Sequence, residues 1–209
     1  MALDLEEQEQ IAELKAWWRQ HGTRILAVLA ALALAFGGWQ FWRGYEQRQA
    51  AEAGALYDTL VQAAQAGDAK ALRDASGALA ESYPRTLYAS MGALVAARFY
   101  FDRDDLKSAK AQLQGVLERS SSQDFRDLAR LRLAAVLLDE KAYDEALKLL
   151  ESPHAPAYEA QYAALKGDVQ VAQNQADAAR AAYRLALEKA GNDSAFRESV
   201  RMRLDALGG

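Results

Sequence analysis

The longest apolar run of the chain extends from Ile25 to Trp42 and contains no charged residue. As a helix, this run would be about 27 Å long, close to the ~30 Å hydrocarbon core of a bilayer. All four tryptophans flank it: Trp17 and Trp18 precede it, and Trp39 and Trp42 end it. Tryptophan favours the membrane–water boundary, because its ring is apolar and its N–H needs a hydrogen-bond partner. The pattern predicts one transmembrane helix with a tryptophan pair at each interface.

The residues around this run distinguish a retained anchor from a cleaved secretory signal. A signal combines a short basic segment, an apolar stretch and a small-x-small cleavage site, and Ala33-Leu34-Ala35 fits such a site. Here the preceding segment is instead long and acidic, and a cut after Ala35 would leave the apolar residues FGGWQFW at the new N-terminus. We therefore expect an anchor that is retained.

Positive charges near the ends of a membrane helix predict its orientation. The N-terminal flank carries Lys15, Arg19 and Arg24, and the C-terminal flank carries Arg43 and Arg48. This bias predicts a cytoplasmic N-terminus and a larger domain on the other side. The expected domains are a cytoplasmic tail (1–24), the transmembrane helix (25–42), a helical linker (43–50) and a helical domain (51–209).

Small residues recur inside the apolar run at helical spacing. Ala27, Ala31 and Ala35 follow one another at intervals of four, and Ala33 and Gly37 form a second pair. Small side chains let the backbones of two helices in lipid approach closely. These residues predict a helix-packing face, although the abundance of alanine in this chain accounts for the spacing equally well.

The pattern after Tyr45 is helical throughout. Ala, Leu, Arg, Lys, Glu and Gln dominate it, and these residues are strong helix formers. No stretch shows the two-residue alternation that is typical of a strand. Short breaks, such as Gly67-Asp68, Arg103-Asp104 and Gly191-Asn192-Asp193, separate segments of roughly ten to seventeen residues, which predicts antiparallel helix pairs.

Three helix pairs share one pattern of small and bulky residues. A small residue is followed by a generally larger one three positions on, by alanine twelve positions on, and by a bulky apolar residue four further. The repeat interval of about 34 residues is that of tetratricopeptide repeats. The matched sets are Ala97, Tyr100, Ala109, Leu113 and Val116; Ala134, Leu137, Ala146, Leu150 and Pro153; and Gly167, Gln170, Ala179, Tyr183 and Ala186.

Two further elements complete the array. Ala50–Ala66 and Ala69–Ser82 form a more divergent fourth pair, and Ser194–Leu207 is a closing helix that covers the last apolar face. The expected fold class is all-α: a single N-terminal transmembrane helix followed by a tetratricopeptide-like solenoid of helix pairs.

Composition narrows the classes of function. The chain of 209 residues has a formal net charge of −4, which argues against nucleic acid as a partner. It has no cysteine and two histidines, so thiolate chemistry and a histidine-rich metal site are excluded. We find no phosphate-binding loop, metalloprotease motif or nucleophile elbow. The sequence therefore predicts a protein that is not an enzyme and binds no cofactor.

Stacked helix pairs commonly bind peptides or proteins on the concave surface made by their first helices. If the repeat register holds, this surface includes apolar positions that would suit an extended polypeptide. The same residues could instead pack against a neighbouring helix as part of the core. The candidate concave face comprises Met91, Leu94, Arg98, Phe101, Leu128, Leu131, Ala135, Leu138, Ala164, Asp168 and Val171.

Other polar residues receive structural assignments. Arg126 and Arg130 stand four apart on one helix, where we expect a solvent-facing side. His154 lies between two prolines in a loop, where we expect its ring to be exposed.

The order of segments resembles that of a known family. An acidic tail precedes EQIAELKAWWRQHG, an apolar helix ends in GGWQFW, and helix-pair repeats follow. In this order the chain resembles the YfgM family of ancillary SecYEG translocon subunits, most specifically over residues 8–45.

The resemblance implies a bacterial inner-membrane protein with a cytoplasmic N-terminus and periplasmic repeats. It implies association with the SecYEG translocon and with a membrane-anchored, peptidyl-prolyl-isomerase-like periplasmic chaperone. The implied role is to pass exported polypeptides towards periplasmic chaperones, and the tail at 1–24 is implied to restrain a stress-response regulator. A membrane-tethered structural adaptor for envelope protein assembly, without a direct translocon role, is the alternative.

Overall fold

The computed structural model describes the backbone of residues 2–208, together with the side chains of residues 15–208 apart from those at 23, 25 and 29. Helices make up the described chain, and no strand occurs in it. Two compact units divide the chain, Met1–Gln49 and Ala50–Gly209. The elements are α1 (Ala2–Ala66), α2 (Ala69–Ser82), α3 (Leu87–Phe101), α4 (Leu106–Arg119), α5 (Gln123–Asp139), α6 (Tyr143–Leu150), the 3-10 helix η1 (Pro156–Tyr158), α7 (Glu159–Ala172), α8 (Ala176–Lys189) and α9 (Ser194–Asp205).

The first unit lies entirely within α1, and its described apolar side chains are largely exposed. Leu34 and Phe41 are each 79% exposed, and Leu32 is 61% exposed. Among the described residues, one helical segment is long and apolar enough to cross a membrane. This segment is Leu26–Ala66 of α1. The predicted membrane run is therefore helical, and the helix continues without a break beyond Trp42.

The tryptophans at the two ends of the run are about half exposed or more and make local contacts. The ring of Trp17 stacks on His21, with 5.2 Å between ring centroids. The Arg43 guanidinium lies 4.9 Å from the ring centroid of Trp39. The Trp42 indole donates a 2.8 Å hydrogen bond to Glu46. These contacts give the rings polar neighbours on their own helix, as an interfacial tryptophan requires.

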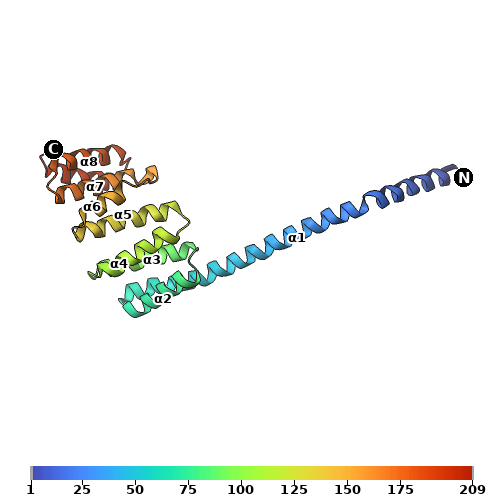
Figure 1. Ribbon diagram of the computed structural model, residues 1–209, viewed down its shortest axis with the longest axis horizontal. Coiled ribbons are helices and arrows are strands. Elements are labelled where there is room, and N and C mark those ends of the chain that lie inside the picture. The colour runs from blue at the N-terminus through green and yellow to red at the C-terminus, as the bar shows by residue number, and fades with distance from the viewer. Residues whose placement is uncertain (1, 209) are drawn as a thin grey trace. The chain divides into compact units, whose positions relative to one another are not determined.

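The second unit is a stack of helix hairpins (Figure 1). Its hairpins are the last part of α1 with α2, then α3 with α4, α5 with α6, and α7 with α8, and α9 packs on α8. Three apolar clusters fill the stack in chain order: one around α1, α2 and α3, a central one from α3 to α7, and one that α7, α8 and α9 share. This architecture confirms the all-α, tetratricopeptide-like fold.

One turn geometry closes all four hairpins. Its key residue has a left-handed backbone, with φ of 75° at Gly67, 61° at Asp104, 63° at Lys141 and 62° at Asn174. The next amide reaches back to a carbonyl one turn inside the helix, which is the Schellman pattern of a helix C-terminus. The four bonds are Asp68 N to Ala63 O (2.9 Å), Asp105 N to Tyr100 O (3.0 Å), Ala142 N to Leu137 O (2.8 Å) and Gln175 N to Gln170 O (2.8 Å).

These turns confirm the repeat register and extend it to the divergent first pair, where Ala63 takes the place of Tyr100. The small positions at Ala97, Ala134 and Gly167 are buried. The residues of the second helices that belong to the same register are also buried. They are Ala109, Leu113, Val116, Ala146, Leu150, Ala179, Tyr183 and Ala186. Pro153 departs from the pattern, because it lies exposed in the loop before η1.

A buried aspartate organises that loop. Asp127 is fully buried and accepts hydrogen bonds from Gln123, from Arg130 and from the amide of Ala155. Its backbone carbonyl accepts from the hydroxyl of Tyr162. A buried carboxylate is favourable only when it is paired and hydrogen-bonded, and here both conditions hold.

Two expectations for this region were wrong. Arg126 and Arg130 are half-buried, because they donate to the Ser120 carbonyl and to Asp127 respectively. The side chain of His154 is 14% exposed, because its ring stacks on Tyr162 with 3.9 Å between centroids. The loop around His154 is therefore held against the stack.

Two glycines give a matched test of this packing. A Cβ on Gly167 would lie 2.5 Å from the Tyr183 ring, whereas a Cβ on Gly77 in α2 meets nothing within 4 Å. We expect Gly167→Ala to lower the free energy of unfolding by about 1–3 kcal/mol, because the crossing of α7 and α8 must open. We expect Gly77→Ala to raise it by about 0.5–1 kcal/mol, because alanine favours the helix. Urea unfolding measures both, and equal effects would contradict the close crossing.

Candidate functional site

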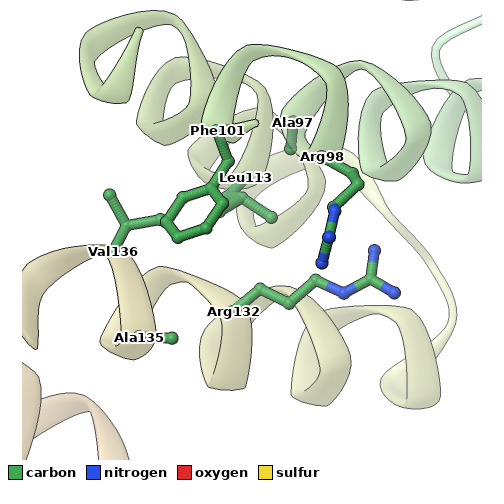
Figure 2. Close-up of a pocket in the computed structure, with 7 residues that line it drawn as sticks. All are labelled: Ala97, Arg98, Phe101, Leu113, Arg132, Ala135 and Val136. Atoms are coloured by element: carbon green, nitrogen blue, oxygen red, sulfur yellow. The ribbon is translucent and has the colours of Figure 1, made fainter. Parts of the chain in front are cut away.

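The first helices of the hairpins line two adjoining hollows, which together we term the inner groove. The smaller hollow has a volume of about 160 Å³ and lies between α3, α4 and α5. The wider one, of about 580 Å³, lies between the last part of α1, α3 and α5. Arg98 and Arg132 line both hollows, so the two hollows are neighbours. Figure 2 shows these two side chains reaching towards each other at one end of the smaller hollow.

Several predicted concave-face residues line the groove. Met91, Leu94 and Arg98 of α3 line the wider hollow, and Phe101 and Ala135 line the smaller one. Their spacing of three and four residues places the α3 members on one face of the helix. Leu94 is 5% exposed, so it also belongs to the core. The structure brings these residues together, and their binding role stays a prediction.

The remaining predicted residues lie outside the two hollows. The side chains of Leu128, Leu131 and Leu138 are partly buried against the central core, and Ala164 is buried. Val171, in the last turn of α7, is 39% exposed. The three leucines and Ala164 therefore pack as core residues do, whereas Val171 does not, and the binding role of all five stays a prediction.

Asp168 of α7 forms hydrogen bonds to residues of two neighbouring helices. It accepts 2.8 Å hydrogen bonds from the Tyr183 hydroxyl and from Arg203, which join α7 to α8 and α9. Burial, and then the hydrogen bond to Asp168, raise the pKa of the Tyr183 hydroxyl. Asp168 therefore anchors the closing helix.

Arg132 was missed by sequence reasoning, although helical spacing could have found it. It stands four residues after Leu128 and three before Ala135, on the same helix face, but the predicted set on this helix held only apolar residues. Its guanidinium donates to the Leu94 carbonyl at 3.4 Å. Burial, and then the charge of Arg98, lower the pKa of Arg132.

The groove combines apolar and cationic side chains. Apolar side chains form its walls and guanidinium groups provide hydrogen-bond donors. Within the part of the chain that the structure describes, no group of three or more His, Cys, Asp or Glu residues could hold a metal ion. Such a surface suits an extended polypeptide.

The sequence matches the tetratricopeptide repeat-like domain family over residues 15–209. The ancillary SecYEG translocon subunit of Neisseria gonorrhoeae is 35% identical over 212 residues, which cover 99% of this chain and all of that protein. The chain belongs to the family of ancillary SecYEG translocon subunits. Further members are the proteins of that name from Haemophilus influenzae, at 29% identity over 99% of this chain and all of that protein, and from Escherichia coli, at 28% over 96% of each.

Membership of the ancillary translocon subunits confirms the resemblance that the order of segments predicted. Two features of the fold agree with it: the tetratricopeptide-like domain and the candidate membrane helix near the N-terminus. In the candidate membrane helix, the small residues Ala27, Ala31, Ala35 and Gly37 are all exposed. They are accessible for packing against another helix, and that role stays a prediction.

The tie at Asp168 predicts a pH-dependent contribution of Tyr183. Because the pKa of Tyr183 is raised on folding, its contribution to stability is complete below the unfolded pKa of about 10 and is lost as the pH rises above it. We expect Tyr183→Phe to lower the free energy of unfolding by about 1–3 kcal/mol at pH 8. Above pH 10, the further decrease in the free energy of unfolding should be smaller for Tyr183→Phe than for the wild type.

Urea unfolding at a series of pH values measures this difference. Tyr143→Phe removes a hydroxyl for which the structure describes no hydrogen bond, so it serves as the control. Parallel alkaline stability curves for wild type and Tyr183→Phe would contradict the assignment.

Proposed function

We propose that this chain is a non-enzymatic inner-membrane subunit associated with the SecYEG translocon, and that its helical domain passes newly exported polypeptides towards periplasmic chaperones. The observation that carries the proposal is full-length similarity to relatives named as ancillary SecYEG translocon subunits. The inner groove supports it, since apolar walls beside cationic side chains suit an unfolded segment.

The proposed partners are the translocon, exported polypeptides, the lipid bilayer and a membrane-anchored, peptidyl-prolyl-isomerase-like chaperone of the periplasm. A further proposed role belongs to the tail at 1–24, which would restrain a stress-response regulator on the cytoplasmic side. The basis for the chaperone and the regulator is the resemblance carried by residues 8–45.

The proposed orientation places the N-terminus in the cytoplasm and the domain at 51–209 in the periplasm. Lys15, Arg19 and Arg24 on the N-terminal flank, against Arg43 and Arg48 on the other, support it. We expect protease added to spheroplasts to degrade the C-terminal domain and to spare the tail, as detected with antibodies against each. Protection of the C-terminal domain would reverse the orientation.

Site-specific photo-crosslinking tests the function. A photoreactive amino acid at Phe101, in the smaller hollow, should crosslink to nascent exported chains, chaperones or translocon subunits. The matched control is Gln114, which is exposed on α4, the second helix of the same hairpin. Crosslinks of equal strength from both positions, or none from Phe101, would contradict a substrate-binding groove.

Exchange of the anchor tests the alternative function. In that alternative, the protein is a structural adaptor and its membrane helix only holds it in the membrane. In this experiment, residues 25–42 are exchanged for an unrelated membrane helix and the photoreactive position is kept. Loss of translocon crosslinks would support contact through the face of Ala27, Ala31, Ala35 and Gly37. Unchanged crosslinks would show that this face is irrelevant.

A further inference from the structure

The inner groove carries positive charge in an otherwise acidic chain. Arg98, Arg103 and Arg132 line the wider hollow together with a single carboxylate, Asp102, whereas the whole chain has a formal net charge of −4. The three arginines are solvent-exposed, with 72% of the Arg98 side chain accessible, so a ligand in the hollow can reach them and salt screens their charge.

The single carboxylate leaves much of this charge unpaired. Arg98 donates through Nε to Asp102 at 2.8 Å. Arg103 stacks on the Phe99 ring, 3.5 Å from its centroid. Arg132 donates to a backbone carbonyl, and among the described side chains no carboxylate lies within ion-pair distance of it.

The arrangement at Arg98 and Arg132 is that of an anion site. Both side chains line the smaller hollow, and Figure 2 shows them on the same side of it. Burial lowers the pKa of Arg132, and the charge of Arg98 lowers it further. Two like charges that face one hollow repel each other, and a carboxylate placed between them relieves that repulsion. A guanidinium binds a carboxylate through two parallel hydrogen bonds, which favours a carboxylate over a monatomic anion such as chloride.

The other end of the smaller hollow is apolar. Phe101, Leu113 and Val136 line it, together with Ala97 and Ala135. Its volume of about 160 Å³ is close to that of a protein cavity of roughly 150 Å³ that binds benzene. The space therefore fits one side chain of the size of phenylalanine or leucine.

We propose that the inner groove selects extended polypeptide segments in which a bulky apolar side chain stands near a carboxylate. The apolar side chain enters the smaller hollow, and the carboxylate lies between Arg98 and Arg132. This inference rests on the proposed function, because it takes exported polypeptides as the occupant of the groove.

Peptide binding to the full chain in detergent micelles tests the selection. The probes are fluorescein-labelled peptides of Gly, Ser and Thr that carry one phenylalanine and, one, two or three residues later, one glutamate. Matched peptides replace the glutamate by glutamine or the phenylalanine by alanine. We expect the tightest glutamate peptide to bind about tenfold more tightly than its glutamine partner in fluorescence anisotropy. Equal affinities would overturn the proposal.

Variants assign the selectivity to its residues. Arg132→Gln should make the glutamate and glutamine peptides bind equally, and Arg132→Glu should favour a peptide with lysine in place of glutamate. Ala135→Leu should fill the smaller hollow and remove the preference for phenylalanine. The controls are Arg184→Gln and Ala111→Leu, both at exposed positions of second helices. Unchanged selectivity in Arg132→Gln would overturn the proposal.

Vesicle binding distinguishes a polypeptide ligand from a lipid headgroup. If vesicles containing phosphatidylglycerol, and not the peptides, show the dependence on Arg132, a lipid headgroup is the ligand and the proposal is wrong. The micelle assay contains no translocon, so a failure of peptide selection leaves the proposed function standing. Conversely, absence of translocon crosslinks together with intact selection would reject the proposed function and keep the binding chemistry.

Discussion

In three of the four hairpins that the structure describes, the first helix carries a small buried residue at one register position, and the arrangement of the domain depends on the close approach that it allows. These residues are Ala97, Ala134 and Gly167, all buried, in successive hairpins. At Gly167 the aromatic ring of Tyr183 occupies the space that a Cβ would need. In the first hairpin the corresponding residue is Leu60, and there Gly92 of α3 provides the room. A repeat can therefore change the residue at the crossing only if its neighbour compensates.

The groove is a consequence of the same register. Because the hairpins repeat, α3 and α5 present equivalent sides to the interior of the stack. Side chains of α3 and α5 that do not enter a hairpin crossing can then meet in a common space. Arg98 and Arg132 are such residues, one from each helix, and the packing of their hairpins brings them to one cavity. The position of the two arginines is thus set by helix packing and not by a loop.

Most of the fold could be predicted from the sequence because its signals are local. The apolar run, the helix-forming composition and the spacing from Ala97 to Val116 each lie within one or two helices. The membership of the first pair was less evident, since Leu60 stands at the small position and the turn at Gly67 shows the register only in three dimensions.

The features that the sequence did not predict involve contacts between different elements. The two prolines around His154 predicted an exposed ring, but Tyr162 and the buried Asp127 hold its loop. Arg132 lay on the predicted face, but its electrostatic environment depends on Arg98, which belongs to another hairpin. Periodicity identifies which side of a helix faces inward, but it does not show which charges lack a partner.

The left-handed residues that close the hairpins have a consequence for how such an array can evolve. Asp and Asn accept this conformation more readily than most residues, whereas Lys141 adopts it without that advantage. Each non-glycine residue there costs about 1 kcal/mol or more, which the packed helices on either side offset. A change to glycine at Lys141 therefore removes this cost and stabilises the domain. The stability gained offsets a destabilising substitution elsewhere, so residues that line the groove can change during evolution without loss of the fold.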